Sequence, residues 1–209
     1  MANTSAYLIP LADIEVETVV NKSRFICAIR HCQDNQQVKQ FIEENRLKYP
    51  DASHHCYAFV SSRPDNSQAY GFSDDGEPSG TAGRPMFAAL QGSSIGEICA
   101  VVTRYFGGTK LGTGGLQRAY GLSVREALLE LQTQLKTPTE SVNLRCNYNQ
   151  VKDIEHVIES FSGVISKQEF TDLISLTISL PIVDIKPFCQ RVFDLTSGQV
   201  KVNTPNSID

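Results

Sequence analysis

The chain has 209 residues, of which 41% are hydrophobic and 20% are charged, and its formal net charge at pH 7 is −4. This composition is typical of a globular protein and excludes collagen-like, low-complexity and largely disordered classes. The negative charge argues against a protein that binds nucleic acid over its whole surface, so such binding would need a local basic patch. The sequence lacks both a signal peptide and a run of about 18 uncharged apolar residues, so we expect a cytoplasmic protein.

The first two thirds of the chain predict a mixture of strands and helices. Asp34 is placed to cap a helix, whose core side would carry Val38, Phe41, Ile42 and Leu47. Residues 98–102 form an uninterrupted apolar run, which is typical of a strand buried on both faces. In chain order we expect strands over 14–20 and 24–30, a helix over 33–49, a strand over 54–61, a long loop or hairpin over 62–85, a short apolar piece over 86–90, a buried strand over 98–102, a loop over 107–115 and a helix from 116 to about 134.

A domain boundary is expected at Pro138, because a helical pattern ends there and proline cannot continue it. This divides the chain into residues 1–137 and 138–209. The second part predicts the order βαββαβ, in which two helices can cover one face of a four-stranded antiparallel sheet, as in the ferredoxin-like fold. The expected elements are a strand over 142–148, a helix over 150–160, strands over 164–170 and 173–180, a helix over 183–195 and a strand over 199–202. The fold class is therefore α+β.

The six cysteines lie far apart and form no C-x-x-C pair. In a reducing compartment this favours buried free thiols over structural zinc or disulfides. His54 and Cys56 would share one side of a strand, so a Cys/His nucleophile pair or a corner of a metal site is geometrically feasible. The signal is weak, since ordinary strand packing explains the same residues, and we expect neither a metal nor a cofactor.

Twelve of the fourteen glycines lie between Gly71 and Gly121, and the segment VVTRYFGGTKLGTGGLQRAY runs from a buried strand through a glycine-rich loop into a helix. Backbone N–H groups at such a helix start bind anions, phosphate above all. Turns and close packing are the alternative use of these glycines. The residues expected at the anion or RNA site are Arg84, Arg104, Gly107, Gly108, Lys110, Gly112, Gly114, Gly115 and Arg118.

Two known phosphate motifs are incomplete here. Thr113 stands where a Walker A loop requires lysine, and Gln117 stands where a dinucleotide fingerprint requires glycine. An ordinary ATPase or dehydrogenase is therefore disfavoured.

An acidic segment, SDDGEPSGTAGRP, precedes the glycine-rich loop. Its dipeptides are turn signals, so one interpretation is a turn with solvated charges. The others are a recognition loop, or a catalytic or Mg²⁺-binding loop. The residues expected in the recognition loop are Asp74, Asp75, Glu77, Ser79 and Thr81.

These motifs resemble the YigZ/IMPACT family in its bacterial two-domain form. The resemblance runs from about residue 15 to residue 131 and is carried by Lys22-Ser23-Arg24-Phe25, by His54-His55-Cys56-Tyr57-Ala58, by the acidic segment and above all by TRYFGGTKLGTGGLQRAY. It implies an N-terminal domain of the ribosomal protein S5 domain 2-like type, followed by a ferredoxin-like domain similar to domain V of elongation factor G. It also implies a loose association with translation and with nucleic acid, and it brings no established catalytic residues.

We favour a non-enzymatic protein that binds RNA or the ribosome and acts in the regulation of translation, with a translation-associated protein as a further candidate partner. Cations and loop N–H groups would hold backbone phosphates. One alternative is an enzyme that handles a phosphorylated small molecule through the glycine-rich loop, with Asp74, Asp75 or Glu77 holding a metal or taking a proton. The other is a protein–protein module docking through the acidic C-terminal domain. A deep pocket lined by both loops would favour the enzyme, and a flat or shallow basic face would favour RNA.

Overall fold

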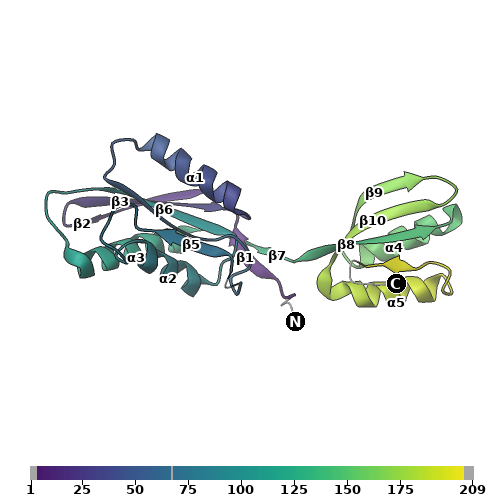
Figure 1. Cartoon of the computed structure of the whole chain (residues 1–209). Coiled ribbons are helices and arrows are strands. Elements are labelled where there is room, and N and C mark those ends of the chain that lie inside the picture. Colours follow the sequence, from purple (N-terminus) through teal and green to yellow (C-terminus); the bar gives the residue numbers. More distant parts are fainter. Residues whose placement is uncertain (1–3, 67, 205–209) are drawn as a thin grey trace. The chain divides into compact units, whose positions relative to one another are not determined.

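The computed structural model describes residues 4–66 and 68–204, and the chain forms two compact units (Figure 1). One unit spans Tyr7–Lys136, and the other contains the residues from Thr137 onward. The division thus falls next to Pro138. Within the described residues, no helix combines the length and the apolar character needed to cross a membrane.

The first domain is built on a five-stranded sheet with the order β2-β3-β6-β4-β5, in which every neighbouring pair is antiparallel. A two-residue turn joins the first two strands, and both its residues, Asn21 and Lys22, have positive φ angles (47° and 66°), as a tight hairpin requires. The strands are β2 (Ile14–Val20), β3 (Ser23–His31), β4 (His54–Val60), β5 (Tyr70–Ser73) and β6 (Ile98–Tyr105).

Helices cover both faces of this sheet (Figure 1). α1 (Asn35–Lys48) packs on one face, while α2 (Gly83–Ser93) and α3 (Gly112–Glu130) pack on the other. Asp34 caps α1 as expected, since its carboxylate accepts a hydrogen bond from the Gln37 N–H. The placement of Leu47 in the core was wrong, because its side chain is 80% exposed on the outer side of the helix.

The alternation of side chains along β6 matters for the site. Ile98, Ala100 and Val102 belong to the core under α2 and α3, while Cys99 and Val101 belong to the core under α1. The prediction of a strand buried on both faces is therefore confirmed. Because the strand continues to Tyr105, the same alternation directs the side chain of residue 104 toward α2 and α3.

Three features of the first domain differ from the sequence prediction. The short apolar piece over 86–90 is part of the helix α2, which ends at Ser93 and is followed by a C-cap, Ser94, in the left-handed conformation (φ 57°). The helix α3 starts earlier and ends earlier than expected. The residues that follow it form β7 (Thr133–Lys136), which pairs with β1 (Tyr7–Pro10) in a separate two-stranded sheet.

The second domain has the predicted βαββαβ order, and its strand order β11-β8-β10-β9 with antiparallel neighbours is the ferredoxin-like arrangement. Both helices contribute to a core against one face of the sheet, centred on side chains such as Ile154, Leu176 and Phe188. The elements are β8 (Thr139–Cys146), α4 (Val151–Ser160), β9 (Val164–Phe170), β10 (Ile174–Pro181), α5 (Ile185–Leu195) and β11 (Val202–Asn203), with short 3₁₀ turns before each helix.

Five of the six cysteines are buried, and Cys189 is half-buried. Burial raises the pKa of the thiols of Cys27, Cys99 and Cys146, so they are protonated at neutral pH. These thiols pack as small apolar side chains, one in each of the three cores: Cys27 under α2 and α3, Cys99 under α1, and Cys146 in the second domain.

Candidate functional site

The acidic segment lies beside α3, the helix that follows the glycine-rich loop, in the first domain. The side-chain amide of Gln117 on α3 donates to the carbonyl of Gly80 at 3.3 Å. Tyr120, one turn further along the same helix, reaches the acidic segment through its hydroxyl. The acidic segment and the first turns of α3 therefore form one region, and the glycine-rich loop leads into it along the chain.

A buried ion pair stands at the centre of this region. Glu77 and Arg104 have side chains only 4% and 7% exposed, and the Arg104 guanidinium donates to Glu77 Oε1. The Tyr120 hydroxyl donates to the same oxygen at 2.8 Å. Arg104 Nε is buried and has no hydrogen-bond partner within the described part of the chain. The cluster thereby ties the acidic segment to β6 and α3.

His54 and Cys56 of β4 complete the cluster. Cys56 Sγ donates to the carbonyl of Asp74 at 3.0 Å and lies 3.3 Å from the Tyr120 hydroxyl. His54 Nδ1 is 2.8 Å from the carbonyl of Asp75, to which it donates. Desolvation by burial raises the pKa of both Cys56 and Tyr120, so at neutral pH neither supplies a thiolate or a phenolate. The geometry is that of a structural hydrogen-bond network.

The remaining carboxylates of the acidic segment also bind other parts of the protein. Asp74 accepts hydrogen bonds from three backbone N–H groups at 2.8–2.9 Å, those of Gly80, Ala82 and Gly83. Burial opposes its ionisation, but the three N–H groups outweigh burial and hold the pKa of Asp74 below its usual value. Since two of these groups open α2, Asp74 serves this helix as an N-terminal cap.

Asp75 joins the segment to α1 and β4. One carboxylate oxygen accepts from the His55 N–H at 2.7 Å, and the other lies 3.1 Å from an Arg46 nitrogen.

Among the predicted hydroxyls, Ser79 is exposed, whereas Thr81 is buried and donates to the carbonyl of Pro78. The interpretation of the acidic segment as a turn with solvated charges was therefore wrong for Glu77, whose side chain is buried.

The glycine-rich loop has one glycine with a clear packing role. A Cβ on Gly107 would lie 2.1 Å from the backbone carbon of Lys22 and 2.3 Å from the backbone nitrogen of Ser23. Gly107 also donates its N–H to the Ser23 hydroxyl. This close approach holds the loop against the β2–β3 turn. At this position the glycine therefore serves close packing, which was the alternative to anion binding.

The loop's other glycines lie at the surface. Gly108 and Gly112 have positive φ angles (86° and 70°), and a Cβ on Gly114 would meet nothing within 4 Å. The helix α3 begins at Gly112 rather than at Leu116, and its N-cap, Leu111, gives no side-chain hydrogen bond. The first N–H groups of a helix have no partner within the helix, and here residues 112–114 are exposed.

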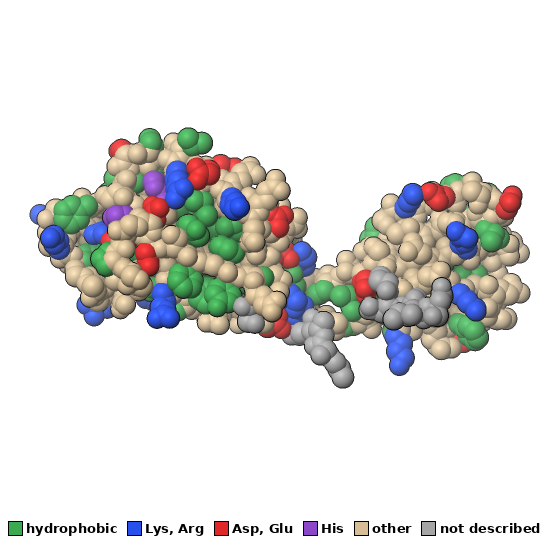
Figure 2. All heavy atoms as spheres, viewed as in Figure 1, with side chains coloured by type: hydrophobic (Ala, Val, Ile, Leu, Met, Phe, Trp, Pro, Cys, Tyr) green, Lys and Arg blue, Asp and Glu red, His purple; other side chains and the backbone are tan. Residues whose placement is uncertain are grey.

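The expected cations separate into two groups. Arg84, Lys110 and Arg118 are exposed. Arg104 is not, and its assignment to an exposed anion site was wrong. Its place on the inward side of β6 turns it under α3, where Glu77 neutralises it. On the face that Figure 2 shows, cations and carboxylates are interspersed over both domains.

The comparisons with known proteins agree with this architecture. The Impact N-terminal domain matches residues 21–128, and a domain of unknown function, DUF1949, matches residues 144–199. The chain is 44% identical over 197 residues to the IMPACT family member YigZ of Escherichia coli, which covers 94% of this chain and 97% of YigZ. This chain belongs to the IMPACT family.

Other relatives show the same two-domain extent. An IMPACT family member of Haemophilus influenzae is 39% identical, covering 94% of this chain and 95% of its own length. A solved structure titled as that of a hypothetical protein is 43% identical, with a TM-score of 0.76, 97% coverage of this chain and 98% of that one. The family likeness thus extends over both domains.

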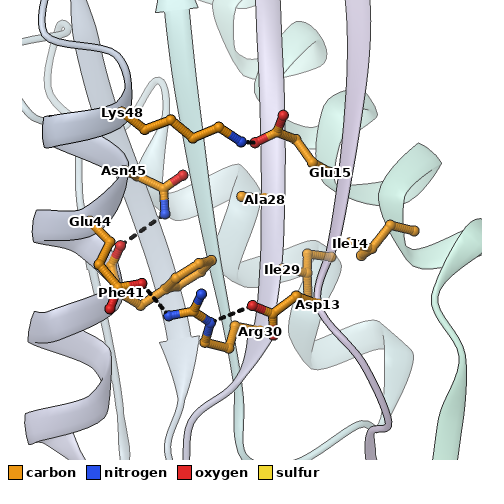
Figure 3. A pocket seen from close by; sticks show the side chains of 10 residues that line it. All are labelled: Asp13, Ile14, Glu15, Ala28, Ile29, Arg30, Phe41, Glu44, Asn45 and Lys48. Atoms are coloured by element: carbon orange, nitrogen blue, oxygen red, sulfur yellow. Dashed lines mark hydrogen bonds and ion pairs between the residues drawn. The ribbon is translucent and has the colours of Figure 1, made fainter.

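A separate hollow of this IMPACT family chain lies between α1 and the strands β2 and β3, with a volume of about 230 Å³ (Figure 3). Arg30 lies between the carboxylates of Asp13 and Glu44, and Lys48 reaches Glu15 at 2.6 Å. All five charged residues of the lining thus pair with one another. Neither predicted loop contributes to this hollow, so it is not the pocket that would favour an enzyme.

Tyr120 was not predicted as a site residue, because a tyrosine four residues after Leu116 in a predicted helix looks like an ordinary core position. The burial of Arg104 had a weak signal, since extending the apolar alternation of residues 98–102 by one step places residue 104 on the inner side.

Proposed function

We propose that this protein binds RNA, in the ribosome or in a related translation complex, without catalysing a reaction. The contact surface is the start of α3 with its preceding loop, together with the start of α2. Lys110 and Arg118 are its principal side-chain contacts. The association with translation follows the family resemblance.

The charge balance at the surface of this region supports the proposal. Between residues 78 and 125 the sequence holds five cations and one carboxylate, Glu97. Two of these six charged residues are buried and do not contribute to the surface charge. Arg104 pairs with Glu77, and Glu97, whose side chain is 6% exposed, pairs with Lys136. All the exposed charges of this stretch are therefore positive, and they are Arg84, Lys110, Arg118 and Arg125.

The backbone supplies a second contribution. An uncapped, exposed helix start offers N–H groups to an anionic oxygen, and the helix dipole adds a favourable potential. Phosphates held by such groups and by Lys or Arg fix position without reading sequence. We therefore expect binding that depends strongly on salt and weakly on RNA sequence.

The enzyme alternative has less support. The carboxylates proposed to hold a metal or take a proton are occupied by other groups of the protein: Asp74 caps α2, Asp75 pairs with Arg46, and Glu77 pairs with Arg104. An enzyme would still be recognised by turnover of a phosphorylated substrate that Asp75→Asn abolishes.

Lys110→Ala and Arg118→Ala are each expected to weaken RNA binding several-fold, because each removes one phosphate contact. The slope of log affinity against log salt should become shallower by about 1 for each variant. Fluorescence anisotropy with a labelled double-stranded RNA and its single strand, across a salt series, measures both effects. Lys39→Ala, an exposed cation on α1, is the matched control and should leave the slope unchanged. Wild-type affinity and slope in both loop variants would contradict this surface.

A further inference from the structure

The sheet of the second domain has one face that its own helices leave open, since α4 and α5 pack on the other face. In the strand register, two adjacent rows of side chains on the open face carry its charged residues. The first row contains Asn203, Asn143, Thr177 and Lys167. The second row contains Arg145, Ser175 and Glu169, and Lys201 lies beside it, just before the pairing of Val202 with Leu144.

Both rows line one open hollow of about 720 Å³. Its surface is polar: Thr177 donates to Asn143 at 2.8 Å, and Lys167 pairs with Glu169 at 2.7 Å. Within the described residues, Arg145 and Lys201 take part in no ion pair. These two cations thus have no direct ion-pair partner among the described residues, although the positive charge of Arg145 helps to lower the pKa of Glu169 in the same row, after the larger effect of Lys167.

Charge is distributed unevenly between the two sides of this domain. The hollow carries three cations, Arg145, Lys167 and Lys201, against one carboxylate, Glu169. The helices α4 and α5 carry the reverse excess, with three cations and four carboxylates, Asp153, Glu155, Glu159 and Asp194. The domain is acidic by composition, but only one of its carboxylates lines the hollow, so the lining of the hollow is basic.

We propose that this open face is a second RNA-binding surface of the chain, which holds the RNA backbone through Arg145 and Lys201. The inference rests on the proposed function and adds a surface to it in the other domain. A face that combines cations with the amides and hydroxyls of Asn143, Ser175 and Thr177 can donate to phosphate oxygens and both donate to and accept from ribose hydroxyls.

RNA fits this face better than an acidic protein segment does. A carboxylate-rich peptide needs cations along its length, whereas here most of the polar groups are neutral amides and hydroxyls. Those groups match the ribose 2′-hydroxyls, which lie between successive phosphates in RNA. The rows also lack an aromatic ring on which a base would stack, so recognition rests on backbone and ribose.

The test compares two triple variants of the full chain that remove the same charges from opposite sides of the domain. One is Arg145→Gln, Lys167→Gln and Lys201→Gln on the sheet face, and the other is Arg191→Gln, Lys152→Gln and Lys186→Gln on the helices. All six side chains are exposed, and circular dichroism checks that each variant folds. Lys201→Gln alone is the milder variant. Affinity for a short double-stranded RNA is measured by anisotropy across a salt series, with and without polyglutamate as a competitor.

We expect the sheet-face triple variant to lose about tenfold in affinity and about 2 in salt slope, while the helix triple variant stays within about twofold of wild type. If the two triple variants behave alike while Lys110→Ala and Arg118→Ala weaken binding, the second surface is wrong and the proposed function stands. Loss in the sheet-face variant alone supports this surface and refutes the loop. Absence of RNA binding by the wild type refutes both. Displacement of RNA by polyglutamate at equal charge would assign the face to an acidic protein and overturn the inference.

Discussion

Glu77→Gln is expected to lower the free energy of unfolding of the first domain by about 3 to 5 kcal/mol, because it leaves the buried Arg104 guanidinium without a compensating charge. The two side chains are 4% and 7% exposed, so water cannot replace the lost carboxylate. Arg104 Nε already lacks a partner within the described residues, which leaves little capacity to absorb the loss. The Tyr120 hydroxyl can still donate to the amide oxygen, so the charge is the main change.

Urea denaturation followed by tyrosine fluorescence measures this effect, because the chain has no tryptophan and six of its seven tyrosines precede Pro138. Glu130→Gln, at the exposed end of α3, is the matched control and should change stability by less than about 0.5 kcal/mol. Replacing both partners by apolar residues, as in Glu77→Leu with Arg104→Met, should recover much of the loss. If Glu77→Gln were as stable as Glu130→Gln, the ion pair of Glu77 with Arg104 would not be what holds the acidic segment in place.

Gly107→Ala is expected to destabilise the first domain by about 3 kcal/mol, at the upper end of the usual cost of overpacking. The added methyl group would meet the backbone of the β2–β3 turn at 2.1–2.3 Å. Backbone atoms in a paired hairpin cannot rotate away as a flexible side chain can, so either the loop or the turn must move.

Gly114→Ala is the matched control for this prediction. Its new methyl group meets nothing within 4 Å, and its position in the first turn of α3 favours alanine over glycine, so stability should rise by about 0.5 to 1 kcal/mol. Opposite signs for the two variants, measured by the same denaturation, would separate packing glycines from surface glycines. Equal effects would contradict the close approach of Gly107 to the turn.

The second domain could be predicted from sequence because each of its elements carries a local signal. Val142, Leu144 and Cys146 alternate with polar residues along β8, and they are buried as that alternation requires. The β1–β7 pair had no such signal. Its strands have four residues each, and Leu135 is 66% exposed, so the pairing depends on contacts more than 120 residues apart in the chain.

The candidate site was only partly predictable for a similar reason. The two loops could be chosen from their glycines and charges, and the structure places the acidic segment beside α3, the helix that the glycine-rich loop leads into. The pairing of Glu77 with Arg104 joins residues 27 apart, and no spacing rule foretells which cation a buried carboxylate selects. The charges of the sequence therefore predicted one exposed cation too many, Arg104, and gave no sign that Glu97 is buried as well.

Co-sedimentation with purified ribosomes across a salt series tests the central claim most directly. Wild-type protein should pellet with ribosomes at low salt and be released as salt rises, because phosphate contacts are lost with increasing ionic strength. The double variant Lys110→Ala with Arg118→Ala should be released at lower salt than Lys39→Ala, which should behave as wild type. Wild-type protein that stays in the supernatant at every salt concentration, or a double variant that pellets like the wild type throughout, would contradict RNA binding through this surface.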